Sequence, residues 1–527
     1  ITYFLLGFPI SLGFVIWTFI SSISCTSRIV LRDILIYINN RRNDASEILI
    51  YGAGAAGARL LKILKSDSKF IVKGFIDDDR SLCGRSILGV NIYPPEEIEN
   101  LKLNKKIKKI LLAIPSIDKD SLRRVLTDLS RTNINVLQIP SLSDIITGNA
   151  RIDNLRPINF EDLLGRDVVH PQYEFLEKDL NKKVILVTGA GGSIGSELCR
   201  ELCSFTPSKI ILLEISEPAL YTIYQELNGD KYKHIQFLPL LGSATDFNLV
   251  NKIIIENKVN IIFHAAAYKH VPLVEMNPLE GIKNNVFSTR VICECAKKNN
   301  VEKFILISSD KAVRPTNLMG ASKRISELLV QAYQDKDSTE PKGLAKKTTF
   351  LMVRFGNVIN SSGSVIPLFQ KQIKDGGPIT LTHEKITRYF MTINEACQLV
   401  IQATSFAKGG DLFLLDMGEP IQIKKIAQQM ISLSGLTLKD DSNPEGDIEI
   451  VISGLRPGEK LYEELLIENN SLPTKHPLIY RAKENYIEYS LLMSLLDELE
   501  KCCSEQDLER TFMLISKIVP EWKRSHE

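Results

Sequence analysis

The sequence predicts an α/β protein with two Rossmann-like units, each a doubly wound parallel sheet, preceded by a transmembrane helix. Two apolar runs, residues 47–51 and 183–188, are each followed directly by a glycine-rich turn and then by apolar residues at helical spacing. This order of strand, turn and helix is typical of a dinucleotide-binding unit. Residues 1–24 contain no charged side chain and match the length of about 20 residues that one membrane span needs.

The stretch after residues 1–24 is a basic juxtamembrane segment, residues 25–46, whose charge predicts that the downstream domains stay in the cytoplasm. The charge comes from Arg28, Arg32, Arg41 and Arg42. A cleaved signal peptide is the alternative, but the sequence shows neither a basic n-region nor a small-residue cleavage site. Because the first residue is Ile, we expect residues 1–24 to be the end of a longer membrane region.

The composition is that of an ordinary globular protein. The 527 residues suffice for two or three domains, and 44% of them are hydrophobic and 24% charged. The net charge of +2 gives no reason to expect a nucleic-acid partner. The nine cysteines form no CxxC pair, which indicates reduced thiols in a cytosolic compartment, and we expect no metal site.

Residues 47–145 form the first predicted Rossmann-like unit. Its glycine turn, residues 52–57, leads into a helix, and a second strand, residues 71–76, ends in three consecutive aspartates. A carboxylate about 20 residues after the glycines is typical of dinucleotide binding. A unit that binds a different nucleotide, or no ligand, fits the pattern equally well. Residues 146–182 lack periodicity, and we expect them to form a connector.

The second unit begins with the strand at residues 183–188 and has the glycine spacing GxxGxxG. Glycines there let the backbone approach a pyrophosphate at the amino end of the next helix. The second strand ends in Glu214, whose carboxylate would accept from the ribose hydroxyls of NAD and repel the extra phosphate of NADP. We therefore expect NAD, with an ordinary surface carboxylate as the alternative. The cofactor-binding residues of the turn are predicted to be Gly189, Gly192, Ser193, Ile194 and Gly195.

The next strand, residues 261–267, ends in small side chains that let a cofactor lie close. The helical pattern that follows it brings a polar side chain toward the nicotinamide half of the cofactor. The predicted contacts of this region are Ala265, Ala266, Tyr268 and Asn285.

The strand at residues 304–307 leads into residues 308–323, which place an acid, a base and hydroxyls at the carboxyl edge of the sheet. Met319 and Lys323 are four residues apart, so a helix that begins near Met319 points both to the same side. This edge is where open α/β sheets bind their ligands.

Six long motifs of the second unit occur in the same order in one known family. They are TGAGGSIGSEL (188–198), HAAAYKHVPLVE (264–275), SSDKAVRPTNLMGASKR (308–324), RFGNVINSSGSVIPLF (354–369), THEKITRYFMTI (382–393) and GLRPGEKLYEEL (454–465). On these motifs the chain resembles the membrane-anchored nucleotide-sugar 4,6-dehydratases of bacterial glycan biosynthesis, the CapD-like branch of the extended short-chain dehydrogenases. The resemblance covers most of the chain.

The resemblance implies an extended short-chain dehydrogenase domain with a small substrate-binding subdomain over residues 183–484. It also implies NAD as the cofactor, UDP-N-acetylglucosamine as the substrate and retention of configuration at C5. The location it implies is the bacterial inner membrane, with the catalytic domains in the cytoplasm, and we expect a homo-oligomer. Residues 485–527 have the pattern of amphipathic helices and carry no catalytic signal.

A 4,6-dehydratase oxidises C4, eliminates water across C5 and C6, and returns the hydride to C6. Lys323 suits a cation beside the cofactor ribose, and the resemblance assigns Asp310 and Lys311 to the elimination. We expect Asp310 to be the acid for the 6-hydroxyl and Lys311 the base at C5, neutral because Lys323 and desolvation lower its pKa. Met319 stands where related enzymes have a proton-accepting Tyr, so Ser309 is expected to bind the 4-hydroxyl instead.

The substrate side is predicted from polar residues that follow later strands. Backbone amides and the side chain of Asn357 suit a diphosphate and a sugar. Arg388 and Arg456 supply forked donors for phosphate oxygens, and the resemblance assigns Glu459 to a ribose hydroxyl. For each arginine, an ordinary ion pair is the alternative. The predicted substrate-binding residues are Lys269, His270, Arg354, Asn357, Ser364, Arg388, Arg456 and Glu459.

Two other functions fit parts of the sequence. A UDP-sugar 4-epimerase shares the cofactor motifs, but it has nothing for Asp310 and Lys311 to eliminate, and the Tyr that epimerases use is absent. A catalytically silent, membrane-tethered nucleotide sensor would need only the two Rossmann-like units.

Overall fold

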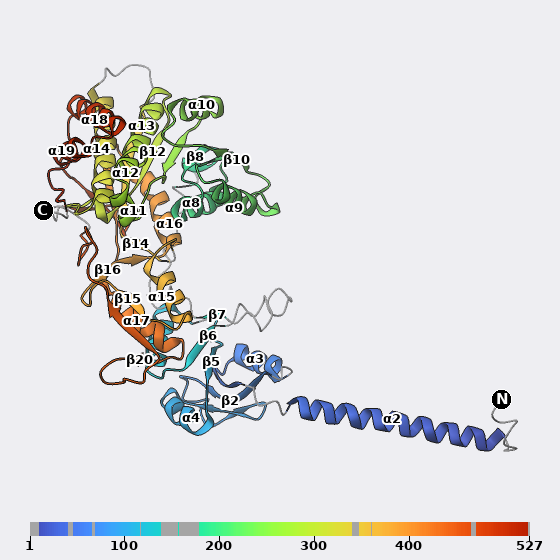
Figure 1. Ribbon diagram of the computed structural model, residues 1–527. Helices are drawn as coiled ribbons and strands as arrows, with labels where there is room; N and C mark the ends of the chain where they lie inside the picture. The colour runs from blue at the N-terminus through green and yellow to red at the C-terminus, as the bar shows by residue number, and fades with distance from the viewer. Residues whose placement is uncertain are drawn as a thin grey trace. The chain divides into compact units, whose positions relative to one another are not determined.

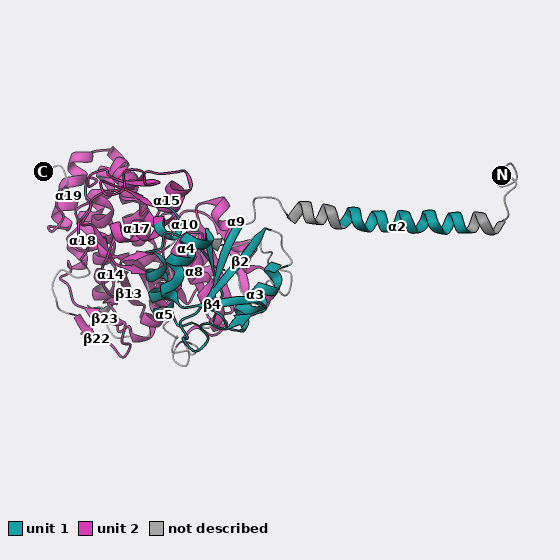
Figure 2. Cartoon of the chain, turned by 90° about the horizontal axis from the view of Figure 1, so that it is seen from below, with its two compact units in different colours: residues 1–159, 432–436 teal, residues 160–431, 437–527 magenta. Residues whose placement is uncertain are grey.

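A computed structural model describes residues 10–40, 46–65, 69–115, 117–138, 156–157, 176, 179–339, 347–359, 361–464 and 471–524. The chain divides into two compact units, residues 1–159 with 432–436, and residues 160–431 with 437–527 (Figure 2). The division at residue 160 falls within the predicted connector, residues 146–182, most of which lies outside the described residues.

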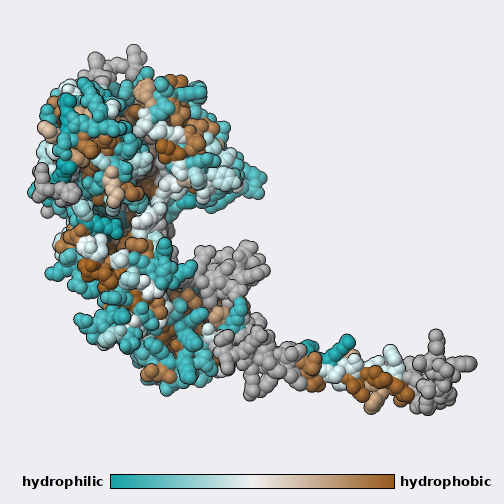
Figure 3. Space-filling model, in the orientation of Figure 1, coloured by the Kyte–Doolittle hydropathy of each residue, from teal (hydrophilic) through white to brown (hydrophobic). Residues whose placement is uncertain are grey.

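The first described element is one helix, α2 (Ile10–Asn40), which covers part of both the predicted membrane span and the predicted basic segment. Apolar side chains on it, among them Trp17 and Phe19, are exposed (Figure 3). The helix continues through Arg28 and Arg32 without a break. In the part of the chain that the structure describes, no helix is long and apolar enough to cross a membrane, and residues 1–9 of the predicted span lie outside the described residues.

The first unit contains a seven-stranded sheet in the order β3-β4-β2-β1-β5-β6-β7 (Figure 1). Its central strand, β1 (Ser46–Tyr51), pairs in parallel with β2 (Phe70–Ile76) and β5 (Lys109–Leu112), as a Rossmann-like unit requires. The glycine turn after β1 leads into α3 (Ala55–Lys65). The remaining elements are β3 (Ser86–Ile87), β4 (Val90–Tyr93), α4 (Ile98–Lys105), α5 (Lys119–Leu129), β6 (Asn135–Gln138) and β7 (Arg156–Pro157).

The second unit contains a nine-stranded sheet in the order β10-β9-β8-β11-β12-β13-β18-β23-β22. The strands from β10 to β18 are all parallel to their neighbours, and β23 and β22 close the sheet in antiparallel orientation. Their bounds are β8 (Val184–Thr188), β9 (Lys209–Glu214), β10 (Gln236–Leu241), β11 (Ile261–His264), β12 (Lys303–Ser309), β13 (Thr349–Phe355), β18 (Asp411–Leu415), β22 (Ser471–Pro473) and β23 (Ile479–Ala482). This is the doubly wound topology that the sequence predicts.

Two apolar cores cover the two faces of this sheet, because successive strand residues point to opposite sides. Leu186 belongs to one core, and its neighbours Ile185 and Val187 belong to the other. The first core takes side chains from α10 (Phe247–Asn257), α13 (Ser288–Lys298), α14 (Leu318–Thr339), α18 (Tyr489–Glu505) and α19 (Leu508–Ile518). The second takes them from α8 (Ser193–Leu202), α9 (Glu217–Leu227) and α16 (Ile393–Ala403). The C-terminal helices predicted over residues 485–527 are thus part of this unit.

Short strands beyond β13 form the smaller part of the second unit. β14 (Asn357–Val358) pairs with β17 (Phe390–Met391), and β16 (Thr387–Arg388) pairs with β19 (Ile421–Gln422). The other elements are α15 (Val365–Lys374), β15 (Ile379–Leu381), α17 (Ile423–Leu433), β20 (Leu438–Lys439) and β21 (Ile448–Ile452). The predicted substrate residues Asn357 and Arg388 lie on two of these strands.

Candidate active site at the carboxyl edge of the second sheet

The glycine turn after β8 depends on two close backbone approaches. A Cβ on Gly195 would overlap the carbonyl oxygen of Gly189, so only glycine lets α8 start this close to the strand. Gly189 has a φ of +65°, and a Cβ there would lie 2.8 Å from the Cα of Ala266. The turn therefore holds β8, α8 and the loop after β11 together without side chains between them.

A cavity of about 280 Å³ opens beside this turn at the carboxyl edge of the sheet. Many of the predicted cofactor-binding residues line it, which supports their grouping in one site. They are Gly189, Gly192, Glu214, Ala265, Ala266 and Tyr268. Ser193 lies at the first position of α8, and its hydroxyl accepts a hydrogen bond from the backbone N–H of Ser362 at 3.2 Å.

The carboxylate of Glu214 lies at the end of β9, in the wall of this cavity, and is fixed by backbone groups. One oxygen accepts from the N–H of Gly191 at 2.9 Å, and the other accepts from Ile215 at 2.9 Å and Ser216 at 3.0 Å. Its free lone pairs are the ones available to a ligand in the cavity.

The side chain of Asn285 is buried and committed to neighbouring groups. Its oxygen accepts from the N–H of Tyr268 at 2.7 Å, and its amide donates to the carbonyl of Tyr268 at 3.0 Å and to the hydroxyl of Ser322 at 2.9 Å. These hydrogen bonds hold the loop at Tyr268 in place, and the position of Asn285 at the nicotinamide half of a cofactor stays a prediction.

Lys323 lies on α14 and is buried beneath the carboxyl edge. Its Nζ donates to the carbonyl of Ile307 on β12 at 3.0 Å. Burial lowers the pKa of Lys323 to about 8, and the charge of Glu327 opposes this shift. Met319, one turn earlier, is buried in the apolar core of this face. The prediction of a helix that begins near Met319 is confirmed, because α14 begins at Leu318.

The ammonium group of Lys311 lies among three oxygen acceptors. Its Nζ is 3.0 Å from Oδ1 of Asp310, 3.0 Å from Oδ1 of Asn357 and 3.6 Å from Oε1 of Glu463. The hydroxyl of Ser309 donates to the same Oδ1 of Asp310 at 2.9 Å. The structure thus brings together three residues that the sequence singled out after β12 and one after β13.

The pKa of Lys311 moves opposite to the expected direction. Burial, the largest influence, lowers it, but the charges of Asp310 and Glu463 outweigh burial and hold it above its ordinary value. Arg388 is the cation that acts against them, and Lys323 is not among the groups that shift it. The expectation of a lysine made neutral by Lys323 and desolvation is therefore wrong for Lys311.

Glu463 is the member of this cluster that sequence reasoning missed. It belongs to the motif at residues 454–465, but it lies in a loop, where no periodicity marks a side chain as inward-facing. Two carboxylate oxygens of the cluster are buried and have no hydrogen-bond partner, Oδ2 of Asp310 and Oε2 of Glu463. Buried unpaired acceptors are costly in a folded protein, and they are typical of sites that bind a ligand.

Arg388 extends the cluster toward the predicted substrate side. Its Nη2 is 3.2 Å from Glu459 and its Nε is 3.7 Å from Glu463, and its other donors contact backbone carbonyls. Arg456 is exposed, and its backbone N–H donates to Glu459 at 3.3 Å. Arg388, Arg456 and Glu459 thus lie together, with the guanidinium of Arg388 held by carboxylates.

Another group of predicted substrate residues lies around the loop before α15. A Cβ on Gly363 would overlap the ring of His270, so the imidazole packs directly on this loop. The hydroxyl of Ser364 is buried without a hydrogen-bond partner. Lys269, beside His270, is exposed.

Arg354 does not reach the site, and its predicted role in substrate binding is corrected. Its guanidinium is fully buried, 2.6 Å from Glu327 and 2.9 Å from Glu484. Arg324 pairs with the same two carboxylates at 3.1 and 2.8 Å. A guanidinium held in this way is not available to a phosphate, so Arg354 stabilises the fold.

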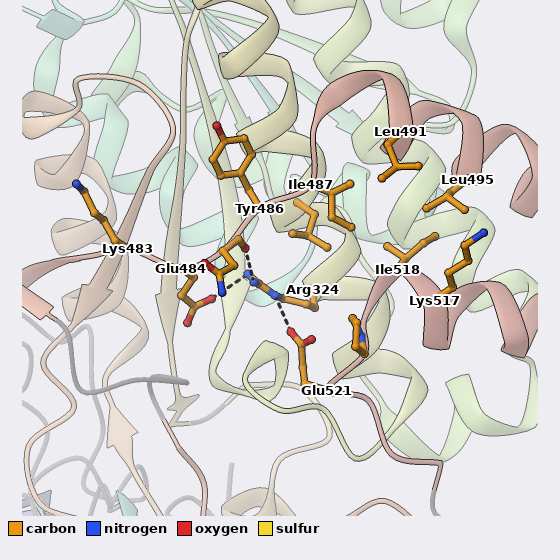
Figure 4. Close-up of a pocket in the computed structure, with 13 residues that line it drawn as sticks. Arg324, Lys483, Glu484, Tyr486, Ile487, Leu491, Leu495, Lys517, Ile518 and Glu521 are labelled. Atoms are coloured by element: carbon orange, nitrogen blue, oxygen red, sulfur yellow. Dashed lines mark hydrogen bonds and ion pairs between the residues drawn. The ribbon is translucent and has the colours of Figure 1, made fainter.

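A larger cavity, of about 490 Å³, borders this ion-pair network away from the glycine turn (Figure 4). Arg324 lies in its wall and donates to Glu521 at 3.2 Å and to the carbonyl of Asn485 at 3.1 Å. Its apolar side comes from α18 and α19, including Leu491 and Ile518. None of the predicted site residues lines it.

The first unit has a glycine turn of similar construction. A Cβ on Gly57 would overlap the carbonyl oxygen of Gly52, and the N–H of Ala53 donates to Asp77 at 2.6 Å, at the end of β2. Tyr51 donates to the carboxylate of Asp78 at 2.9 Å. These contacts account for Gly52 and Gly57 and for two of the three aspartates without a ligand, and the ligand of this unit stays an open prediction.

The fold and this site define a dinucleotide-binding α/β protein whose acid and lysine follow the fifth strand of the sheet. Residues 185–484 match the model of a family described as polysaccharide biosynthesis protein, and the chain belongs to that family. A relative named capsular polysaccharide biosynthesis protein CapD, from Staphylococcus aureus, is 40% identical over 505 residues, which are 94% of this chain and 82% of the relative.

Two further relatives match the second unit in length. A UDP-N-acetylglucosamine 4,6-dehydratase (inverting) from Campylobacter jejuni is 30% identical over 320 residues, which are 60% of this chain and 86% of the relative. The crystal structure of Pen from Bacillus thuringiensis is 33% identical, with a TM-score of 0.50 over 60% of this chain and 99% of that one. These similarities support the fold and the family of the second unit.

Proposed function

We propose that this protein is an NAD-dependent nucleotide-sugar 4,6-dehydratase, a hydro-lyase that acts on UDP-N-acetylglucosamine. The observation that carries the proposal is the buried contact of Asp310 with Lys311 at the end of β12, where Oδ2 of Asp310 has no partner. An acid–base pair at this edge suits the removal of water across C5 and C6. The dehydratase from Campylobacter jejuni, similar over most of its own length, supports the same substrate.

The cavity at the glycine turn fits NAD. Glu214 has carboxylate lone pairs in the cavity wall for ribose hydroxyls, and the amino end of α8 suits a pyrophosphate. Bound NAD+ would accept a hydride from C4 of the sugar and return it to C6. Lys323 is the cation near this edge, and we assign it to the ribose and to the positive potential that favours loss of the hydride.

The chain's own residues handle the protons. Ser309, whose hydroxyl donates a hydrogen bond to Asp310, is assigned to the 4-hydroxyl with a water completing the transfer, because Met319 is buried and cannot accept a proton. Oxidation at C4 makes the C5 proton acidic, so Asp310 and Lys311 then act on C5 and on the 6-hydroxyl. Asn357 holds Lys311 in place.

The substrate's diphosphate and uridine are assigned to residues around this centre. Arg456 is exposed and free to turn toward a phosphate, and the unpartnered hydroxyl of Ser364 is available to a ligand. Arg388 and Glu459 hold each other in position for the ribose. Lys269 and His270 complete this side of the proposed site.

Incubation of the full chain with UDP-N-acetylglucosamine tests the proposal, with the product followed by NMR and mass spectrometry. We expect a 4-keto-6-deoxy sugar nucleotide that is lighter than the substrate by one water. A C4 epimer of unchanged mass would establish the 4-epimerase instead. Tightly bound NAD with no turnover of any UDP-sugar would favour the silent sensor.

A further inference from the structure

We propose that Lys311 donates the proton to the departing 6-hydroxyl, that Asp310 removes the C5 proton, and that Glu463 is a positioning residue that keeps Lys311 charged. This inference rests on the proposed dehydratase function. It reverses the roles that the sequence suggested for Asp310 and Lys311.

The first argument is the number of acceptors around Nζ of Lys311. Oxygens of Asp310, Asn357 and Glu463 surround it at 3.0, 3.0 and 3.6 Å. An ammonium donates hydrogen bonds to the two nearer oxygens, and its charge pairs with the carboxylate of Glu463 at 3.6 Å. A neutral amine has two N–H groups and a lone pair, and that lone pair would face an oxygen. The geometry is therefore that of a proton donor.

The second argument is the charge around Lys311. The charged groups that face it are Asp310 from the end of β12, Glu463 from the loop after residue 460 and Arg388 from β16. Burial lowers the pKa of Lys311, but the two carboxylates outweigh burial and Arg388, and the pKa is raised. A base at C5 would have to give up this proton first, whereas an acid at C6 uses it directly.

The third argument is the free oxygen of Asp310. Its Oδ2 is buried and has no hydrogen-bond partner, while Oδ1 accepts from Ser309 and Lys311. Gly356 lies beside Oδ2: a Cβ on Gly356 would be 3.1 Å from it. A carboxylate with one anchored oxygen and one unpartnered oxygen is a ready proton acceptor. Glu463 also has an unpartnered oxygen, Oε2, and its Oε1 pairs with both Lys311 and Arg388. We assign the C5 proton to Asp310 because it lies next to Lys311 at the end of β12, and the holding role to Glu463 because it pairs with both cations.

The elimination balances with these roles. The C5–H bond breaks, its proton passes to Oδ2 of Asp310, and its electron pair forms the C5=C6 double bond. The C6–O bond breaks, and the leaving hydroxyl takes a proton from Lys311 to become water. After the hydride reaches C6, Asp310 returns a proton to C5. During oxidation Ser309 passes the proton of the 4-hydroxyl to solvent, so Asp310 is unprotonated when it acts on C5. Lys311 then regains a proton from solvent, and the protein ends as it began.

A Lys311→Met variant in heavy water tests which group acts on C5. We expect it to oxidise C4, seen as absorbance of reduced nicotinamide, and to return UDP-N-acetylglucosamine that carries deuterium at C5, without the 4-keto-6-deoxy product. Reduced nicotinamide with no deuterium at C5 would show that Lys311 is the base and would overturn the inference. If the wild-type chain makes no 4-keto-6-deoxy product, the proposed function itself fails, which is a different outcome.

The second test uses Glu463→Gln and stands even if Lys311→Met fails to fold or to oxidise C4. Loss of the negative charge lowers the pKa of Lys311, so we expect the alkaline limb of the turnover profile to move down by about one pH unit, without a rise in the maximum rate. If a neutral Lys311 were the base, the same change would raise the maximum rate by up to about tenfold, because it enlarges the neutral fraction.

Matched variants separate charge from structure in this test. Glu463→Asp keeps the charge and should restore most of the wild-type profile. Glu464→Gln removes the adjacent carboxylate, which pairs with Arg314 at 2.6 Å outside the cluster, and should leave the profile unchanged. A shift in Glu464→Gln as large as that in Glu463→Gln would contradict the role of Glu463.

Discussion

The guanidinium of Arg354 and the carboxylate of Glu327 form an ion pair of 2.6 Å in which neither side chain is exposed. Without Arg354, the guanidinium of Arg324 remains beside two buried carboxylates, Glu327 and Glu484, so one buried negative charge is uncompensated, which costs about 3 kcal/mol or more. We expect Arg354→Met to lower the free energy of unfolding by that amount while the KM for substrate stays near wild type, provided that the variant folds. Denaturant unfolding and steady-state kinetics check this.

The control for Arg354 is Arg510→Met, because Arg510 pairs with Glu498 on the surface and its loss should change stability little. If Arg354→Met has the stability of wild type and a much higher KM, Arg354 binds the substrate and this account of its role is wrong.

The glycine turn gives a prediction of its own. In Gly195→Ala the new Cβ overlaps the carbonyl oxygen of Gly189, so α8 or the turn must shift at a cost of about 1–3 kcal/mol. We expect less NAD in the purified variant and a lower unfolding temperature. Gly229→Ala is the matched control, because the nearest atom to its Cβ lies at 3.8 Å. Equal NAD content in both variants would contradict the role of the turn.

The buried side chain of His264, at the end of β11, should make the free energy of unfolding depend on pH. Its Nδ1 lies 2.7 Å from the hydroxyl of Thr188, and burial lowers its pKa to about 3 from 6.5, with Lys323 acting in the same direction. Between pH 6.5 and 3 the unfolded chain binds a proton here that the folded chain does not. This histidine therefore contributes stability above pH 6.5 that is lost as the pH falls, by about 1.4 kcal/mol per pH unit.

The measurement for His264 is the slope of unfolding free energy against pH in wild type and in His264→Gln. We expect a shallower slope in the variant over the same range. Parallel slopes would show that another group causes the loss of stability.

We expect a substitution of Lys323 to lower turnover without lowering stability. Burial disfavours its charged form, as its lowered pKa shows, so Lys323→Met should be as stable as wild type or more stable. If the cation assists oxidation at C4, turnover should fall by about a hundredfold. The exposed Lys252→Met is the control and should keep full turnover. A Lys323→Met variant with a lower free energy of unfolding and wild-type turnover would contradict the assignment of Lys323 to catalysis.

The parts that the sequence predicted are local in the chain. The strands around both glycine turns, Glu214 at the end of β9 and the adjacent pair Asp310–Lys311 follow from runs of neighbouring residues. Burial on both faces makes such strands continuous apolar runs, which are easy to see in a sequence.

The parts that it missed depend on distant partners. Arg354 pairs with Glu327 and Glu484, which no spacing rule connects, so it resembled any other arginine near the end of a strand. The charge on Lys311 was misjudged because Glu463, more than a hundred residues later, reaches it from a loop.

The central claim is that one hydride moves from C4 to C6 of the same sugar. UDP-N-acetylglucosamine labelled with deuterium at C4 tests this directly, with the product examined by NMR. We expect deuterium at C6 of a 4-keto-6-deoxy product and none at C4. Deuterium that remains at C4, in substrate or in its epimer, would contradict the account.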